Sequence, residues 1–267
     1  MTHVVVAGVV FGAMLLGAGV LHLLPRLGAA GRGLSERLIR APGLDVVVTY
    51  FTVAPPVVCV VVDGWWGVAG ALVGQVAAVL VWCQVHELCH PAARRGPRIV
   101  KELNEVVGAV RNHAALWVTV IAAPGFWLVR VVEIVLWPCF IVLVHFPRYK
   151  EGEWVNCSRQ KFEGLVGHDL IWCLYCDWMT GVWSLGTEML RNVESFWCPI
   201  RFPAAKKSEH CEREFPDLAQ GWVDAEKGMA EVAETLREKY EPRKGPHVWY
   251  GHPRRLKMEG EQEPAEE

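Results

Sequence analysis

Residues 4–24 read VVVAGVVFGAMLLGAGVLHLL, an apolar run of 21 residues with no formal charge. An α-helix rises about 1.5 Å per residue, so this run can cross a hydrocarbon core of about 30 Å. A secretory signal peptide is the alternative, but the run has no basic region before it and exceeds the usual apolar core of about 7–15 residues. The sequence therefore predicts a transmembrane helix here. Gly8 and Gly12 form a GxxxG step that would allow another helix to approach closely, although ordinary membrane composition also explains them.

The composition of the whole chain agrees with membrane insertion. Of 267 residues, 52% are apolar and 21% are charged, and the mean hydropathy is +0.21. Residues 146–267 hold 17 of the 27 Lys and Arg and 22 of the 29 Asp and Glu, so an apolar half precedes a polar half. The net charge of −2 excludes a strongly basic nucleic-acid binder, and no nucleic-acid partner is expected.

Two further apolar runs, 46–62 and 67–85, flank the sequence Asp63-Gly64-Trp65-Trp66-Gly67. This pattern predicts a transmembrane hairpin with interfacial tryptophans at its tip. Pro55-Pro56 predicts a kink in the first arm, because proline interrupts helical hydrogen bonding.

A fourth apolar stretch, 114–146, is longer than one crossing needs and contains Pro124-Gly125 and Pro138. Arg130 and Glu133 have i,i+3 spacing, so we expect them to pair on one helix face within the membrane. The stretch could cross once, but we expect a broken or re-entrant hairpin that returns the chain to the side on which it started.

The orientation follows from basic residues in the loops. Arginines and lysines follow the first and third apolar runs, which places both loops in the cytoplasm and the amino terminus outside. We expect an integral protein of a bacterial-type inner membrane, with the lipid bilayer and other membrane subunits as partners. The C-terminal domain is expected in the cytoplasm.

The second half of the chain divides into three regions. Residues 147–215 are rich in Cys and Trp, with helical spacing around 165–180, a break expected at Gly181 and Gly186, and a second helix near 187–196. Residues 216–241 have the pattern of an amphipathic helix, and residues 242–267 form a polar tail that we expect to be disordered.

The expected fold class is therefore an all-α integral membrane protein. Its N-terminal region, 1–146, forms a bundle of about four transmembrane or re-entrant helices, and a small membrane-apposed helical domain rich in Cys and Trp follows.

A first candidate site is the HExxH sequence His86-Glu87-Leu88-Cys89-His90 at the end of the third apolar run. On a helix, histidines at i and i+4 share a face and can both bind Zn²⁺, while the glutamate can act as a general base on metal-bound water. Pro91 disfavours helical geometry at His90. The alternative is a pair of interfacial histidines that only form hydrogen bonds at the lipid headgroups, and we expect the same role for His22, His113 and His145.

The HExxH pentapeptide resembles the zinc-binding helix of membrane-embedded HExxH metallopeptidases, which also place it beside transmembrane segments. The resemblance covers these five residues. It implies that His86 and His90 bind the metal and that Glu87 is catalytic, and it leaves a third ligand unassigned.

A second candidate site is a group of cysteines within residues 157–211. Thiolates are the soft ligands that Zn²⁺ and iron–sulfur clusters select. The candidate ligands are Cys173, Cys176 and Cys198, with Cys157 or Cys211. The spacing after the C-x2-C pair matches neither a zinc ribbon nor a ferredoxin, and the alternatives are buried structural cysteines or a reactive thiol pair.

Three functions follow from these patterns. The first is a membrane protein with a cysteine-rich metal or iron–sulfur site in an electron-transfer or accessory role. The second is a membrane-embedded HExxH zinc hydrolase, and the third is a non-catalytic membrane scaffold. The cofactor is accordingly zinc, an iron–sulfur cluster, or none.

Overall fold

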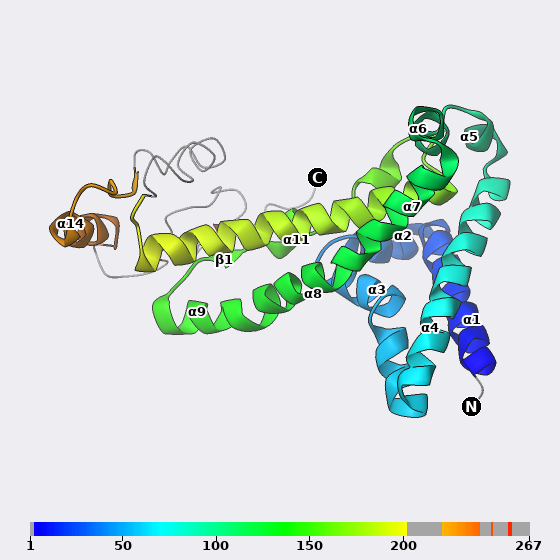
Figure 1. Ribbon diagram of the computed structural model, residues 1–267, viewed down its shortest axis with the longest axis horizontal. Coiled ribbons are helices and arrows are strands. Elements are labelled where there is room, and N and C mark those ends of the chain that lie inside the picture. Colours follow the sequence, from blue (N-terminus) through cyan, green and yellow to red (C-terminus); the bar gives the residue numbers. More distant parts are fainter. Residues whose placement is uncertain (1–2, 202–220, 241–246, 248–255, 258–267) are drawn as a thin grey trace. The chain divides into compact units, whose positions relative to one another are not determined.

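The computed structural model describes residues 3–201, 221–240, 247 and 256–257, and these are mostly helical (Figure 1). Within this part of the chain, three helical segments are long and apolar enough to cross a membrane: His3–Arg26, Ala54–Cys89 and Ala109–Val144. The protein thus has the helices of a membrane protein, with three such segments where the sequence predicts about four membrane-inserted helices.

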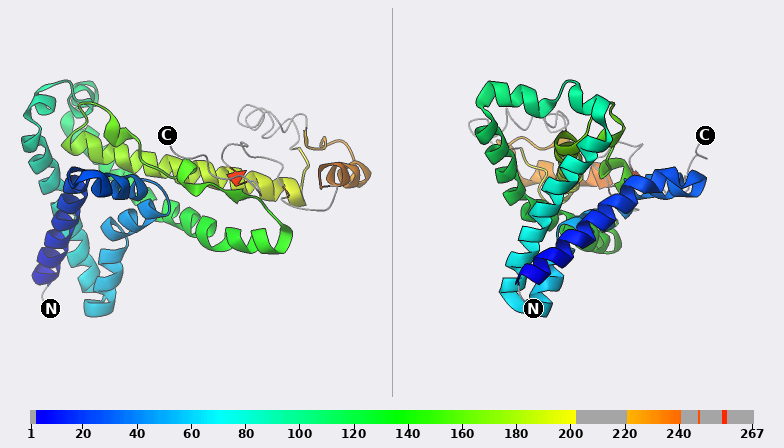
Figure 2. Two further views of the ribbon diagram at one scale, coloured as in Figure 1. Left: turned by 180° about the vertical axis from the view of Figure 1, so that it is seen from behind. Right: turned by 90° about the vertical axis from the view of Figure 1, so that its right-hand side faces the viewer.

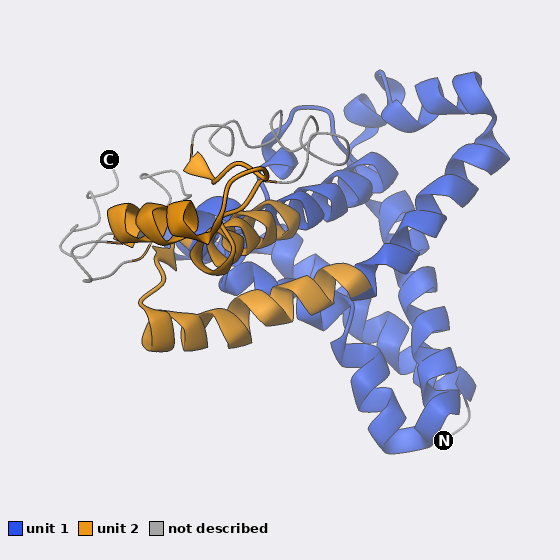
Figure 3. Ribbon diagram, turned by 60° about the vertical axis from the view of Figure 1, so that its left-hand side comes forward, with its two compact units in different colours: residues 1–124, 151–181 blue, residues 125–150, 182–267 orange. Residues whose placement is uncertain are grey.

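The chain forms two compact units, coloured separately in Figure 3. Unit 1 comprises Met1–Pro124 and Glu151–Gly181, and unit 2 comprises Gly125–Lys150 and Val182–Glu267. The long helix α11 (Gly167–Trp197) contributes residues to both units, and the predicted division at residues 146 and 147 stays a prediction.

Helix α1 (His3–Leu23) packs along α4 (Ala54–Cys89) in unit 1 (Figures 1 and 2). A Cβ atom on Gly74 would lie 2.5 Å from the carbonyl oxygen of Ala7, and one on Gly70 would lie 2.8 Å from that of His3. The glycines that allow close approach are therefore on α4. Gly8 and Gly12 do not make this contact, because a Cβ on either would meet nothing within 4 Å, so an approach of another helix to them stays a prediction.

The predicted turn after residue 62 is present within α4. Asp63 (φ −140°, ψ 18°) and Gly64 (φ 62°, ψ −157°) are not helical, and Figure 1 shows the chain reversing direction within α4. The positive φ of Gly64 is readily adopted only by glycine. The break expected near Pro55 also occurs, since α3 (Gly43–Phe51) ends before the prolines and α4 begins with them in its first turn.

The segment Ala109–Val144 is one helical run, not the predicted hairpin. It comprises α7 (Ala109–Thr119), the 3-10 turn η2 (Val120–Ala122), α8 (Ala123–Val131), the π-helix η3 (Val132–Leu136) and α9 (Trp137–Val144). The residues at the junctions keep helical backbone angles, so no chain reversal occurs. Arg130 Nη1 donates to Glu133 Oε2 at 2.7 Å, with both side chains buried, which confirms the predicted pairing.

Short elements connect these helices. They are η1 (Leu24–Arg26), α2 (Gly28–Leu38), α5 (Pro91–Arg95), α6 (Ile99–Val107), β1 (Arg148–Tyr149), α10 (Glu151–Trp154) and η4 (Arg159–Lys161).

Helix α11 continues through Gly181 and Gly186, where the sequence predicts a break. A Cβ on Gly181 would lie 2.4 Å from the Trp154 carbonyl oxygen, and one on Gly186 would lie 2.8 Å from Val129 Cγ1. Each glycine therefore makes room for a close contact inside its own unit. Packing offsets the low helix propensity of glycine, about 1 kcal/mol per residue.

The last helix is shorter than predicted. Residues 216–220 lie outside the described residues, residues 222–228 form turns and a bridge between Val223 and Ile200, and α14 spans only Met229–Tyr240. In the predicted polar tail, the structure describes His247 and β2 (Leu256–Lys257), which pairs antiparallel with β1. The rest of that tail lies outside the described residues.

Candidate metal centre

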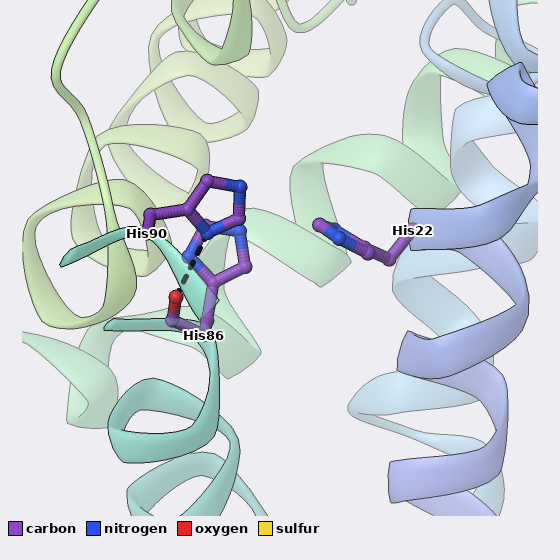
Figure 4. Close-up of side chains that lie close together, drawn as sticks. All are labelled: His22, His86 and His90. Carbon is purple, nitrogen blue, oxygen red and sulfur yellow. Dashed lines mark hydrogen bonds between the residues drawn. The ribbon is translucent and has the colours of Figure 1, made fainter. Parts of the chain in front are cut away.

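Three histidines meet at one end of α1 and α4 in unit 1. His22 lies near the end of α1, His86 lies in the last turn of α4, and His90 follows α4 directly (Figure 4). Each offers a ring nitrogen, and these nitrogens lie within 4.8 Å of one another. Among the residues that the structure describes, no other three histidine, cysteine or acidic side chains bring their ligand atoms this close together, and such a group could hold a metal ion.

The HExxH sequence brings two of these rings together. The centroids of His86 and His90 are 4.3 Å apart in a stacked arrangement. The α-helix ends at Cys89 and His90 has non-helical backbone angles (φ −125°, ψ 64°), as expected for a residue before proline. His90 nevertheless remains ordered, because its Nδ1–H donates to the His86 carbonyl oxygen at 2.8 Å. That bond leaves the Nε2 lone pair of His90 available.

Burial and two contacts fix the position of the His86 ring. Its side chain is buried, the ring of Trp82 stacks on it at a centroid distance of 4.6 Å, and the Gly167 N–H donates to its Nδ1 at 3.1 Å. Gly167 has a φ of 51°, and a Cβ there would lie 2.7 Å from the Cys83 carbonyl oxygen, so the close approach of α11 to α4 requires glycine. A metal ion that takes the Nδ1 lone pair of His86 must replace this hydrogen bond.

His22 completes the group from a distant part of the sequence. Its ring centroid lies 5.2 Å from that of His86 and 5.7 Å from that of His90, edge-on to both. His22 is predicted from the sequence to form hydrogen bonds at the lipid headgroups, and its place beside His86 and His90 was not foreseen. The available signal was that His22 and His86 both stand at the ends of apolar runs, which membrane spans can bring to one face.

Glu87, the predicted catalytic base, takes part in a buried ionic group. Arg98 Nη2 donates to Glu87 Oε1 at 2.8 Å, and Arg98 Nε donates to Asp169 Oδ2 at 2.7 Å. The side chain of Arg98 is 2% exposed and that of Asp169 is 4% exposed. The Glu87 carboxylate is therefore committed to Arg98, and the group joins the end of α4, the start of α6 and the start of α11.

Asp169 gives this group a dependence on pH. Burial disfavours its charged form, but interactions with His168, with Arg98 and with the Val100 amide outweigh burial and lower the pKa of Asp169. A lowered pKa means that the carboxylate stabilises the fold above its unfolded pKa of about 3.9, and that this stability is lost as the pH falls through the folded value.

We therefore expect the thermal midpoint in detergent to fall, as the pH is lowered below about 4, by more in the wild type than in Asp169→Asn. Glu87 and His168 also face this group and are unchanged in Asp169→Asn, so the difference between the two curves reports on Asp169. Parallel curves would contradict the role given to Asp169.

The predicted cysteine ligands are not gathered in this way. Cys157 is buried, its thiol donates to the Leu174 carbonyl oxygen at 3.8 Å, and burial with the nearby Asp177 raises its pKa to about 12. Burial also raises the pKa of Cys173, which opposes formation of the thiolate that binds metals. Cys176 and Cys198 are exposed and belong to different units, and Cys211 lies outside the described residues.

No protein-family model, curated protein or solved structure matches this chain. The function of the three-histidine site must therefore follow from its geometry and chemistry. Three neutral imidazoles can hold a divalent transition metal and leave a coordination position open to water or substrate.

Proposed function

We propose that the protein is an integral membrane metalloprotein that binds Zn²⁺ through His22, His86 and His90. The observation that carries this proposal is the approach of three imidazole nitrogens, from two different helices, to within 4.8 Å of one another. Zinc–nitrogen bonds of about 2.0–2.1 Å place tetrahedral ligand atoms about 3.3 Å apart. Rotations of the histidine side chains can shorten the distances between their nitrogens from up to 4.8 Å to about 3.3 Å.

The surroundings of the site support metal binding. The His90 Nδ1–H bond to a backbone carbonyl is the usual arrangement for a metal-binding histidine, because it fixes the tautomer and leaves Nε2 for the metal. Trp82 restricts the orientation of His86 and limits access of water to one side of its ring.

The proposed chemistry is hydrolysis by a metal-activated water. Three neutral ligands leave the full charge of Zn²⁺ in place, and in such sites bound water ionises with a pKa of about 7. We assign Glu87 a positioning role in place of the predicted role of general base, because its carboxylate already accepts a hydrogen bond from Arg98. Water bound at the open position would supply the nucleophile.

The proposal is tested by zinc analysis of the full chain purified in detergent. We expect about one zinc per chain in the wild type and a loss of affinity of at least about 100-fold in His22→Ala, because the site loses a ligand. His113→Ala is the matched control, since His113 lies beside His168 and outside the cluster. Equal zinc content in His22→Ala and the wild type would contradict the proposal.

The cysteine-based electron-transfer function remains a separate proposal. It is supported by the position of Cys173 and Cys176 within one turn of α11. It predicts that Cys173→Ser/Cys176→Ser loses bound metal while His22→Ala retains it. If neither the wild type nor any variant contains metal, the scaffold function is supported instead. The placement of the C-terminal residues in the cytoplasm is also a proposal.

A further inference from the structure

A basic pocket lies where α4 ends and α5 and α6 begin. Its volume is about 510 Å³, and it is lined by Glu87, Leu88, Pro91, Arg94, Arg95 and Lys101. Three of these six side chains are cationic. The single acidic one, Glu87, already accepts a hydrogen bond from the buried Arg98, so the pocket has an excess of positive charge.

The cations of the pocket remain accessible. The side chain of Arg94 is 48% exposed, and its Nε lies 3.9 Å from Glu87 Oε2, too far for a hydrogen bond. Lys101 Nζ donates to the Arg94 carbonyl oxygen at 3.3 Å, which keeps its ammonium group at the pocket. Arg95 is exposed. Guanidinium groups bind phosphate through paired hydrogen bonds, and an ammonium group adds a point charge.

The apolar side of α6, on the face opposite Lys101, is exposed as well. Ile99, Leu103, Val106 and Val107 are 51%, 41%, 76% and 46% exposed. Their i, i+4, i+7 and i+8 spacing places them on one helix face. Because α5 and α6 connect two candidate membrane spans, we infer that they lie at a membrane surface. A helix with an apolar face and basic neighbours is typical of the lipid headgroup region.

We propose that this pocket binds the phosphate headgroup of an anionic phospholipid. The cations supply the charge complementarity, and the membrane spans on either side bring the pocket to the depth of the headgroups. The inference does not depend on the zinc site, because it uses none of the three histidines.

The test is native mass spectrometry of the full chain in detergent with added phosphatidylglycerol or phosphatidylcholine. We expect the wild type to retain one phosphatidylglycerol in preference to phosphatidylcholine. Arg94→Gln/Arg95→Gln should weaken that retention by about 10- to 30-fold. Arg32→Gln/Arg37→Gln, which removes two exposed arginines from α2, is the matched control and should change it less than about twofold.

Three outcomes would overturn the proposal. Equal loss in the two double variants would mean general surface attraction, and equal retention of the two lipids would mean that no headgroup is recognised. Displacement of the lipid by millimolar inorganic phosphate would assign the pocket to a free phosphate compound. Zinc content is expected to be unchanged in Arg94→Gln/Arg95→Gln, so failure of this inference is distinguishable from failure of the zinc site.

Discussion

Replacing Gly74 with leucine is expected to lower zinc affinity strongly, although the substitution changes none of the three histidines. Any Cβ at Gly74 would lie 2.5 Å from the Ala7 carbonyl oxygen and 3.2 Å from the Phe11 backbone nitrogen. These are backbone atoms of α1 and cannot turn aside, so α1 must move away from α4. His22 moves with α1, and the ligand set is broken.

Overpacking of this kind costs about 1–3 kcal/mol, which corresponds to a loss of zinc affinity of about 10- to 100-fold. The measurement is a zinc titration of the detergent-purified protein. Gly12→Leu is the matched control, because Gly12 also lies in an apolar helix but has open space around it, and its zinc affinity should stay within about twofold. Normal zinc affinity in Gly74→Leu would show that helix packing does not position His22.

Replacing Arg98 with methionine is expected to destabilise the fold by about 3–5 kcal/mol. Arg98 is the cation between Glu87 and Asp169, whose side chains are 12% and 4% exposed. Without it, two carboxylates lie close together with little solvent. Their repulsion and desolvation oppose the contact between α4 and α11 that also brings Gly167 to His86.

Unfolding with increasing fractions of denaturing detergent, followed by circular dichroism, measures this change in the free energy of unfolding. Arg94→Met is the control, because Arg94 is half exposed and 3.9 Å from Glu87, and an exposed pair contributes about 0–1 kcal/mol. A change for Arg98→Met as small as that of the control would contradict the structural role of the buried ionic group.

Local patterns predicted several parts of the fold. The apolar run at 4–24, the turn at Asp63 and Gly64, and the Arg130–Glu133 pair all depend on neighbouring residues, and each is found where the sequence indicates. Hydropathy and proline or glycine positions carry that information directly.

Other predictions failed because packing decided them. Gly181 and Gly186 read as helix breakers, yet α11 runs through both because each glycine faces a close neighbour. Pro124 and Pro138 suggested a hairpin, yet prolines near the starts of α8 and α9 are accommodated within one helical segment. The contact of Gly70 and Gly74 with α1 had no local signal that singled it out, and the GxxxG step of Gly8 and Gly12 is not the one that packs against α4.

The sequence predicted two of the three histidines of the candidate site. His86 and His90 follow from i,i+4 spacing on a helix, which is local information. His22 is more than 60 residues away, and its contribution depends on the register of α1 against α4. The ion pair of Glu87 with Arg98 also arises from tertiary structure, since Arg98 lies beyond α4 and α5, directly before α6.

The most direct test of the three-histidine site is X-ray absorption spectroscopy at the zinc edge on the zinc-loaded full chain. We expect a first shell of nitrogen or oxygen ligands at about 2.0 Å with the outer-shell scattering of imidazole rings, reduced in His22→Ala. A sulfur shell at about 2.3 Å would contradict the histidine site and place the metal on the cysteines.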